Sequence, residues 1–175
     1  RVILVLVLLM LVACSSEYEM ITYETVSDEA VVEVNEMVKI KVETNKGDFV
    51  IELYSETPIS SANFEKLVKD GFYDGLTFHR YEPNFVIQGG DPSGDGTGGS
   101  SETIDLELTG GSHSRGTVGM ARSNDPNSAS SQFFVNLADN TFLDSGYAVF
   151  GTVTEGMDVV DQLRAGDTMS KVSII

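Results

Sequence analysis

Alternation of apolar and polar residues is the feature of this sequence that most constrains its fold. Between residues 38 and 43, valine and isoleucine alternate with lysine and glutamate. A second alternating segment, from Phe49 to Leu53, follows the turn-forming sequence Asn45-Lys46-Gly47. A period of two places all the apolar side chains of a strand on one face. The two segments therefore predict a β-hairpin with one buried face.

Short strand-like runs continue through the rest of the chain, separated by clusters of Gly, Pro, Asn and Asp. The runs cover residues 78–81, 85–88, 116–121, 132–136 and 148–153. Runs of this length bounded by turn-forming residues are typical of strands. The pattern predicts a mainly β domain, either a closed antiparallel barrel or a sandwich.

Two helices are also expected. After Pro58, either Ser60 or Ser61 can cap a helix that ends near Gly71. Its apolar positions, three and four residues apart, are Phe64, Leu67 and Val68. A second, short helix fits residues 157–164. The first helix presents one apolar side and is therefore expected to cover an apolar surface.

Charge and cysteine content exclude several classes of protein. The chain has 27 Asp and Glu against 11 Lys and Arg, a formal net charge of −16. Nucleic-acid binding requires clustered positive charge, so no nucleic-acid partner is expected. The single cysteine excludes an internal disulfide and cysteine-rich zinc sites.

The beginning of the sequence predicts export. The apolar run from Val2 to Ala13 is too short to span a membrane but has the length of a signal-peptide core. Its end, Leu11-Val12-Ala13-Cys14, resembles the lipobox of prokaryotic lipoproteins, which implies a signal peptide at residues 1–13 and lipidation of Cys14. We therefore expect an exported, membrane-anchored lipoprotein at the cell surface or on the periplasmic side. The alternative is a buried core segment with an inert thiol.

An acidic segment follows the cysteine. From Ser15 to Met37 there are seven acidic residues and no Lys or Arg. Like charges keep a chain extended, so residues 14–37 are predicted to be a spacer ahead of a domain at residues 38–175. The partial alternation at residues 31–34 leaves an extra edge strand equally possible for the last third of this segment.

Two chemical motifs match in letters but lack their structural context, and a third, the hydrolase motif Gly-x-Ser-x-Gly, is absent from the sequence. Residues 91–102 have the spacing of a calcium loop, yet no helix flanks them. The Gly-x-Gly-x-x-Gly pattern at residues 94–99 is followed by no helix that could bind a pyrophosphate. His79 and His113 are the only histidines, and neither lies in a recognisable nucleophile motif. No metal, cofactor or nucleophilic catalysis is predicted.

Arg80 is unusually placed for a surface charge. On a strand, Phe78 and Arg80 share one face, so the guanidinium lies beside aromatic surface. A single arginine of this kind usually serves packing. Here, however, segments rich in glutamine and phenylalanine occur at residues 85–90 and 131–136 as well.

Seven ordered motifs between Val38 and Ile175 resemble those of the cyclophilin-type peptidyl-prolyl cis/trans isomerases. They are Phe78-His79-Arg80, Val86-Ile87-Gln88-Gly89-Gly90-Asp91, Gly96-Thr97-Gly98-Gly99, Gly119-Met120-Ala121-Arg122, Ser131-Gln132-Phe133-Phe134, Phe142-Leu143-Asp144 and Val149-Phe150-Gly151. The resemblance implies a closed eight-stranded antiparallel β-barrel capped by two α-helices, with the substrate groove on its outer face. It also implies catalysis of rotation about Xaa-Pro bonds, without a cofactor. Together with the predicted export, this makes exported or surface proteins the expected substrates.

The same resemblance implies a set of site residues. The catalytic ones are Arg80, Phe85 and Gln88. The substrate-binding ones are Val86, Ala121, Arg122, Ser123, Gln132, Phe134, Phe142, Leu143 and Tyr147. The expected partners are proline-containing polypeptides, bound by a monomer. Because an arginine stays charged at all physiological pH values, its chemistry is expected to be independent of pH.

Two other functions stay open at this point. The first is a catalytically idle module that uses the same groove to bind proline-containing peptides or to act as a scaffold. The second is a barrel that carries a small ligand, which requires an open interior, whereas the alternating Val and Ile residues suit a filled one.

Overall fold

The computed structural model describes residues 37–108 and 111–175. The predicted signal peptide, the lipidation site Cys14 and all of the predicted spacer except Met37 lie outside these residues. None of the helices in the two described ranges combines the length and apolar character of a membrane span.

The predicted hairpin is confirmed. β1 (Lys39–Thr44) pairs antiparallel with β2 (Gly47–Leu53), in a register that places Thr44 opposite Gly47. Ile40 and Val42 of β1 are completely buried, as their alternation predicted. Gly47 closes the turn with φ of 129°, a conformation that side chains rarely adopt.

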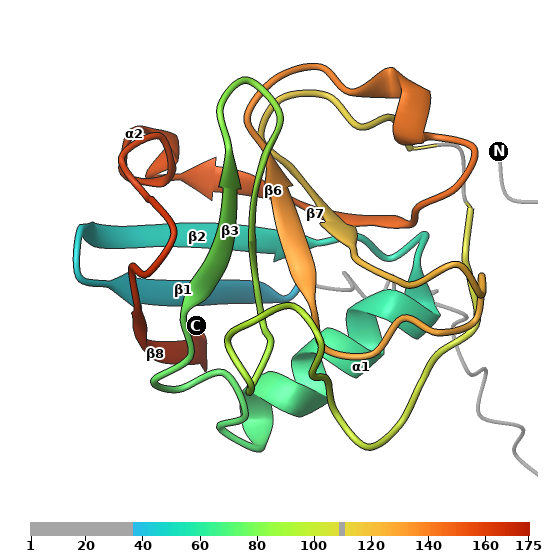
Figure 1. The fold of residues 1–175 in the computed structure, drawn as a ribbon, viewed down its shortest axis with the longest axis horizontal. Helices are drawn as coiled ribbons and strands as arrows, with labels where there is room; N and C mark the ends of the chain where they lie inside the picture. The colour runs from blue at the N-terminus through green and yellow to red at the C-terminus, as the bar shows by residue number, and fades with distance from the viewer. Residues whose placement is uncertain (1–36, 109–110) are drawn as a thin grey trace, which may run out of the picture. The chain divides into compact units, whose positions relative to one another are not determined.

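Six further strands complete one antiparallel sheet of eight (Figure 1). They are β3 (Phe78–Glu82), β4 (Val86–Gly89), β5 (Thr117–Met120), β6 (Phe133–Asn136), β7 (Val149–Glu155) and β8 (Met169–Ile174). The spatial order is β3-β4-β6-β5-β7-β2-β1-β8, and all neighbours run antiparallel. The mainly β prediction is confirmed. β8 was not predicted, because its buried residues Met169 and Val172 are three positions apart and do not alternate.

The sheet curls into an open half-barrel, so the prediction of a closed barrel is wrong. β3 and β8 are the two edges of the sheet, and they form no ladder with each other in the described residues. A single bridge joins Thr77 to Thr168, and the Phe78 N–H donates to the Asp167 carbonyl at 2.8 Å. The contact between the edges is confined to the beginnings of the two strands, which leaves the ladder open.

Helix α1 (Pro58–Lys69) begins earlier than the predicted cap at Ser60 or Ser61, so that prediction is wrong. Thr57 is the N-cap residue, and a proline occupies the first helical position, where no N–H is required. The Ser61 hydroxyl is used elsewhere, since it donates to the Tyr54 carbonyl at 2.8 Å. The predicted apolar face is confirmed by the burial of Phe64, Leu67 and Val68.

Glu107, distant in sequence, caps this helix. Its Oε1 accepts the Ile59 N–H at 3.1 Å, and its Oε2 accepts both the N–H and the hydroxyl of Ser60 at 3.0 Å. Free N–H groups and the helix dipole make the beginning of a helix electropositive. The carboxylate of Glu107 therefore ties the segment before β5 to α1.

We expect Glu107→Gln to lower the free energy of unfolding by about 1 kcal/mol, the usual value of an N-terminal cap. The amide removes the charge and one of the two accepting oxygens. Urea denaturation of both variants measures the change. Glu155→Gln, at an exposed glutamate at the end of β7, is the matched control. Equal losses in the two variants would show that Glu107 is not a cap.

The second helix is shorter than predicted. α2 (Met157–Val160) was expected to reach residue 164. The chain instead turns after Val160 and buries Leu163 completely. The Arg164 N–H then donates to Asp167 at 2.7 Å, which stabilises the turn. A short 3₁₀ helix, η1 (Thr141–Leu143), was not predicted.

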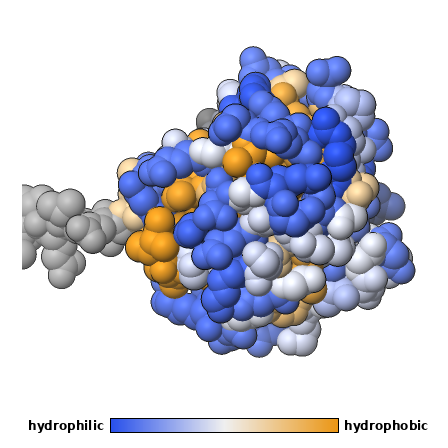
Figure 2. Space-filling view, turned by 90° about the vertical axis from the view of Figure 1, so that its left-hand side faces the viewer, coloured by the Kyte–Doolittle hydropathy of each residue, from blue (hydrophilic) through white to orange (hydrophobic). Residues whose placement is uncertain are grey.

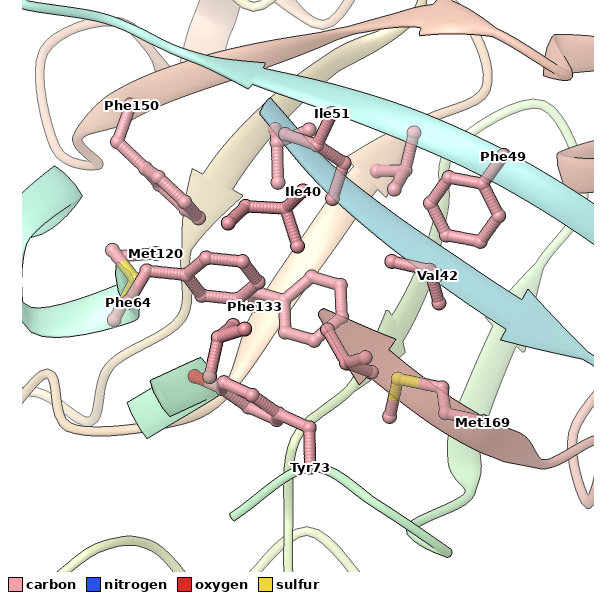
Figure 3. Close-up of a cluster of buried hydrophobic side chains, with 14 of the residues drawn as sticks. Ile40, Val42, Phe49, Ile51, Phe64, Tyr73, Met120, Phe133, Phe150 and Met169 are labelled. Carbon is pink, nitrogen blue, oxygen red and sulfur yellow. The ribbon is translucent and has the colours of Figure 1, made fainter. Parts of the chain in front are cut away.

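Large side chains fill the interior of the half-barrel (Figure 3). The aromatic ones, all at most 1% exposed, are Phe49, Phe64, Phe78, Phe133, Phe150 and Tyr73. Phe64 of α1 lies 5.2 Å from Phe133 and 5.1 Å from Phe150, measured between ring centroids, so the helix closes over the sheet through aromatic contacts. A packed interior of this kind argues against a carrier that holds a ligand inside the barrel.

The surface is mostly hydrophilic on the face drawn in Figure 2, where apolar residues form separate patches. The exposed large apolar residues of the described ranges are Met37, Ile59, Leu108, Phe142, Ile174 and Ile175. Scattered apolar residues of this kind are common on soluble domains.

Candidate active site

A small pocket opens on the outer face of the sheet, not in its interior. It is lined by nine of the predicted residues: Arg80, Phe85, Val86, Gln88, Ala121, Arg122, Phe134, Leu143 and Tyr147. They come from β3, the turn between β3 and β4, β4 itself, β6, the residues after β5 and the segment around η1. The cavity has a volume of about 150 Å³, room for one small ring.

The pocket is apolar at its base and polar at one side. Phe134 is only 5% exposed, and Tyr147 lies edge-on to it with 6.1 Å between the ring centroids. Val86 is buried beside them, and Leu143 is half-buried. Aromatic and branched walls bind a flat apolar ring through dispersion and burial.

The polar side carries the guanidinium of Arg80. Its Nη1 donates to Gln88 Oε1 at 3.3 Å, and its Cζ lies 5.5 Å from the centroid of the Phe85 ring. Glu82 lies 3.7 Å from Nε, an exposed ion pair that contributes little to stability. A guanidinium has five N–H donors, so Arg80 has donors to spare for a ligand in the pocket.

A chain of amides orients this guanidinium. The carbonyls of Gly96 and Gly98 can only accept, so the Gln132 amide nitrogen donates to them, at 3.1 and 2.7 Å. Gln132 Oε1 therefore accepts from Gln88 Nε2 at 2.8 Å, and Gln88 Oε1 is left to face Arg80. The backbone of the glycine-rich loop thus determines which atom Arg80 meets.

The sequence profile described as cyclophilin type peptidyl-prolyl cis-trans isomerase/CLD matches residues 38–174. The chain belongs to this family. A peptidyl-prolyl cis-trans isomerase of Acinetobacter baylyi is 50% identical over 137 residues, covering 74% of this chain and 72% of that protein. Peptidyl-prolyl cis-trans isomerase B of Bacillus subtilis is 44% identical over 133 residues, covering 74% and 91%. The family predicted from the motifs is confirmed.

Solved cyclophilin structures have the same fold. A cyclophilin-type isomerase from Cryptosporidium parvum superposes with a TM-score of 0.75 at 29% identity, covering 79% of this chain and 98% of that one. The same protein solved in the presence of the dipeptide Ala-Pro gives a TM-score of 0.74 at 30% identity, covering 78% and 98%.

The three other predicted residues of the described ranges lie just outside the cyclophilin pocket. Ser123 and Gln132 line a second, more polar cavity of about 370 Å³ that shares Gln88, Ala121 and Arg122 with the first. Phe142 stacks on Phe85 with 5.9 Å between ring centroids and is 71% exposed. It extends the aromatic surface of the pocket without lining the cavity. The remaining prediction, Cys14, lies outside the described residues.

Arg122 holds one rim of the cyclophilin pocket by its side chain. Its Nε donates to the Gly146 carbonyl at 2.8 Å, and its guanidinium lies 4.7 Å from the centroid of the Tyr147 ring. The resemblance implied only that Arg122 binds substrate, and this bracing of the rim by its side chain was not predicted. The guanidinium joins the end of β5 to the segment that carries Tyr147.

Sequence reasoning missed the buried polar residues beneath the pocket. His113, Asn136 and Asn140 are at most 3% exposed, and Asn140 Nδ2 donates to the Phe85 carbonyl at 2.9 Å. One signal was present: Asn136 directly follows the apolar run Phe133-Phe134-Val135, where a polar residue at a strand end requires a partner.

The calcium-like loop is a structural loop. Asp91 is 1% exposed, and its carboxylate accepts backbone N–H groups from Ser93 at 2.8 Å and Asp95 at 3.0 Å. Burial acts to raise the pKa of Asp91, but the hydrogen bonds from backbone N–H groups outweigh it, and the pKa lies below its ordinary value. Within the described ranges no three His, Cys, Asp or Glu side chains are grouped to hold a metal.

Proposed function

We propose that the chain is a peptidyl-prolyl cis/trans isomerase that accelerates rotation about Xaa-Pro bonds in proline-containing polypeptides, as a monomer. One observation carries this proposal: an arginine whose donors are oriented by an amide chain lies beside a small aromatic pocket. The similarity of the chain to proteins named peptidyl-prolyl cis-trans isomerase also supports the proposal.

The reaction breaks no covalent bond. Amide resonance gives the C–N bond partial double-bond character and a rotation barrier of about 18–20 kcal/mol. When the amide twists, the proline nitrogen becomes pyramidal and regains its lone pair. A donor aimed at that nitrogen binds the twisted amide more strongly than the planar one, and this difference lowers the barrier.

Catalysis of this rotation requires that the proline ring is held and that a donor faces the proline nitrogen, and the residues of the pocket can do both. Phe134, Val86 and Leu143 would hold the pyrrolidine ring while the preceding residue rotates. Arg80 would donate to the proline nitrogen, and Gln88 would keep its guanidinium in place. Phe85 supports the guanidinium from its ring face. The main chain at Arg122 would pair with the residue before proline.

NMR exchange spectroscopy of a short Ala-Pro peptide with the full chain tests the proposal. We expect cross-peaks between the cis and trans forms that appear only when the protein is present. The idle binding module predicts a different result, in which the peptide signals shift or broaden but exchange no faster than in buffer.

We further propose that the protein is an exported, lipid-anchored isomerase that acts on exported or surface proteins. The support is the sequence Leu11-Val12-Ala13-Cys14 behind an apolar run, followed by an acidic spacer. Slow proline isomerisation, which lasts about 10–100 s without a catalyst, can limit the folding of such clients.

Substitution of the cysteine tests the anchor. The protein expressed with its own leader is expected to fractionate with membranes, and Cys14→Ser is expected to give soluble protein or an uncleaved precursor. Metabolic labelling with a radioactive fatty acid reports lipidation directly. A mature Cys14→Ser protein that still fractionates with membranes would refute the lipid anchor.

A further inference from the structure

His113 is a completely buried histidine that contacts the pocket from below. It precedes β5 and is 0% exposed. Its Nε2 lies 3.1 Å from the Tyr147 carbonyl oxygen, and its Nδ1 lies 3.1 Å from Asn136 Nδ2. The proposed chemistry of Arg80 makes no use of this ring.

The hydrogen bonds allow only one form of this imidazole. The Phe85 carbonyl can only accept, so Asn140 Nδ2 donates to it, and the same nitrogen donates to Asn136 Oδ1 at 2.9 Å. Asn136 therefore turns its Nδ2 toward His113 Nδ1, which must accept. The Tyr147 carbonyl accepts as well, so the proton lies on Nε2. The ring is neutral, with Nε2 protonated.

The same ring supports a third residue of the pocket. His113 stacks on Phe134, with 5.5 Å between ring centroids and 21° between ring planes. Gly119 of β5 allows this close packing, because a Cβ there would lie 2.4 Å from Phe134 and 2.9 Å from His113. Through hydrogen bonds and stacking, His113 is connected to Phe85, Phe134 and Tyr147, which all line the pocket.

We propose that His113 is a positioning residue of the isomerase, whose neutral ring sets the separation of the pocket walls and whose protonation opens the pocket. The inference rests on the proposed function. A proton on Nδ1 would face the N–H of Asn136, so the chain from Phe85 to Tyr147 would break at that contact. A loss of activity on acidification that depends on His113 would report this opening of the pocket.

The surroundings of the ring favour the neutral form at neutral pH. Burial lowers the pKa of His113, while its contact with the Tyr147 carbonyl and the charge of Asp144 act in the opposite direction without cancelling this effect. The Asp144 carboxylate accepts the His113 backbone N–H at 2.8 Å. The nearby positive group is Arg122, whose guanidinium lies over the ring of Tyr147, while His113 contacts the carbonyl of the same tyrosine.

The lowered pKa of His113 determines how the stability of the folded chain changes with pH. The pKa of His113 in the folded chain lies below the ordinary value of about 6.5 of the unfolded chain. Between these two values the unfolded chain binds more protons. The stabilisation by neutral His113 is therefore complete above about pH 6.5 and is lost as the pH falls toward the folded-state pKa.

The test measures KM and kcat for an Ala-Pro peptide with the full chain, from about pH 8 to about pH 4.5. We expect KM to rise by about tenfold on acidification, the loss typical of a broken buried hydrogen bond, with a smaller change in kcat. His113→Gln, whose amide nitrogen can replace Nε2 as donor to Tyr147, is expected to abolish this rise and to keep the KM of the wild type at pH 8 within about threefold. His113→Ala is expected to show the high KM at all pH values.

His79 provides the matched control, because it is the only other histidine in the chain and burial lowers its pKa too. His79→Gln should retain the acidic rise in KM. A rise that persists in His113→Gln, or disappears in His79→Gln, would overturn the proposal. Circular dichroism at each pH separates loss of the pocket from unfolding.

Two readouts do not depend on catalysis. The ¹⁵N shifts of the His113 ring must show a proton on Nε2 and an acceptor at Nδ1 near pH 8, and any other tautomer rejects the proposal. The dissociation constant of the peptide, from its NMR shifts, should rise on acidification in the wild type but not in His113→Gln. An inactive wild type that shows this binding pattern would refute the proposed isomerase function and leave the role of His113 supported.

Discussion

Replacing Arg80 by alanine is expected to lower kcat/KM for an Ala-Pro peptide by about 10²-fold or more, mostly through kcat. The loss is large because the donor is fixed before the reaction, by Gln88, Gln132 and the loop carbonyls. NMR exchange spectroscopy on the wild type and the variant measures it. Little stability should be lost, because the guanidinium is half-exposed and its ion pair with Glu82 is on the surface.

Two further variants, Arg80→Lys and Arg164→Ala, test whether the loss depends on the geometry of the guanidinium and on its place in the pocket. Lysine keeps the charge but not the planar fork, so Arg80→Lys should also be impaired if geometry matters more than charge. Arg164 stacks 4.3 Å over Tyr81, as Arg80 does over Phe85, but it does not line the pocket. Arg164→Ala should therefore retain wild-type activity. Full activity in Arg80→Ala would rule out the proposed mechanism.

The largest loss of stability is expected at Phe64. Its truncation to alanine should lower the free energy of unfolding by about 3–5 kcal/mol, the range for a buried phenylalanine. The ring is completely buried and is the contact of α1 with Tyr73, Phe133 and Phe150, at centroid distances of 4.9, 5.2 and 5.1 Å. Such a loss is a large part of the total stability of a domain.

Phe142→Ala is the matched control for this change, because it deletes the same ring at a position that is 71% exposed. Urea denaturation should show a change below about 0.5 kcal/mol for Phe142→Ala. Similar midpoints for the two variants would mean that α1 is not held by Phe64.

Much of the fold followed from local patterns in the sequence. The period of two identified β1 and β2, and spacings of three and four identified the buried face of α1. Local patterns failed where long-range contacts decided the outcome. β8 forms beside β1 without alternating, and α1 is capped by Glu107 and not by a nearby serine.

In the candidate site, too, some residues were predicted from the sequence and others were found only in the structure. The resemblance to cyclophilins implied all nine residues lining the pocket, among them Arg80, Gln88 and Phe134. It did not identify the group beneath the pocket, because His113, Asn136 and Asn140 act only through partners elsewhere in the chain. Asn140 binds the carbonyl of a residue 55 positions away, and His113 one that is 34 positions away.

The sequence alone determined the apolar residues that face the core on β1, β2 and α1, seven of the eight strands, and the family to which the chain belongs. These properties depend on the order of neighbouring residues, because side-chain direction repeats every two residues in a strand and every 3.6 in a helix. The tertiary structure alone decided that the barrel stays open, that Glu107 caps α1 and that the imidazole of His113 is neutral. These properties depend on which donor meets which acceptor after distant segments have packed, and no local period encodes that pairing.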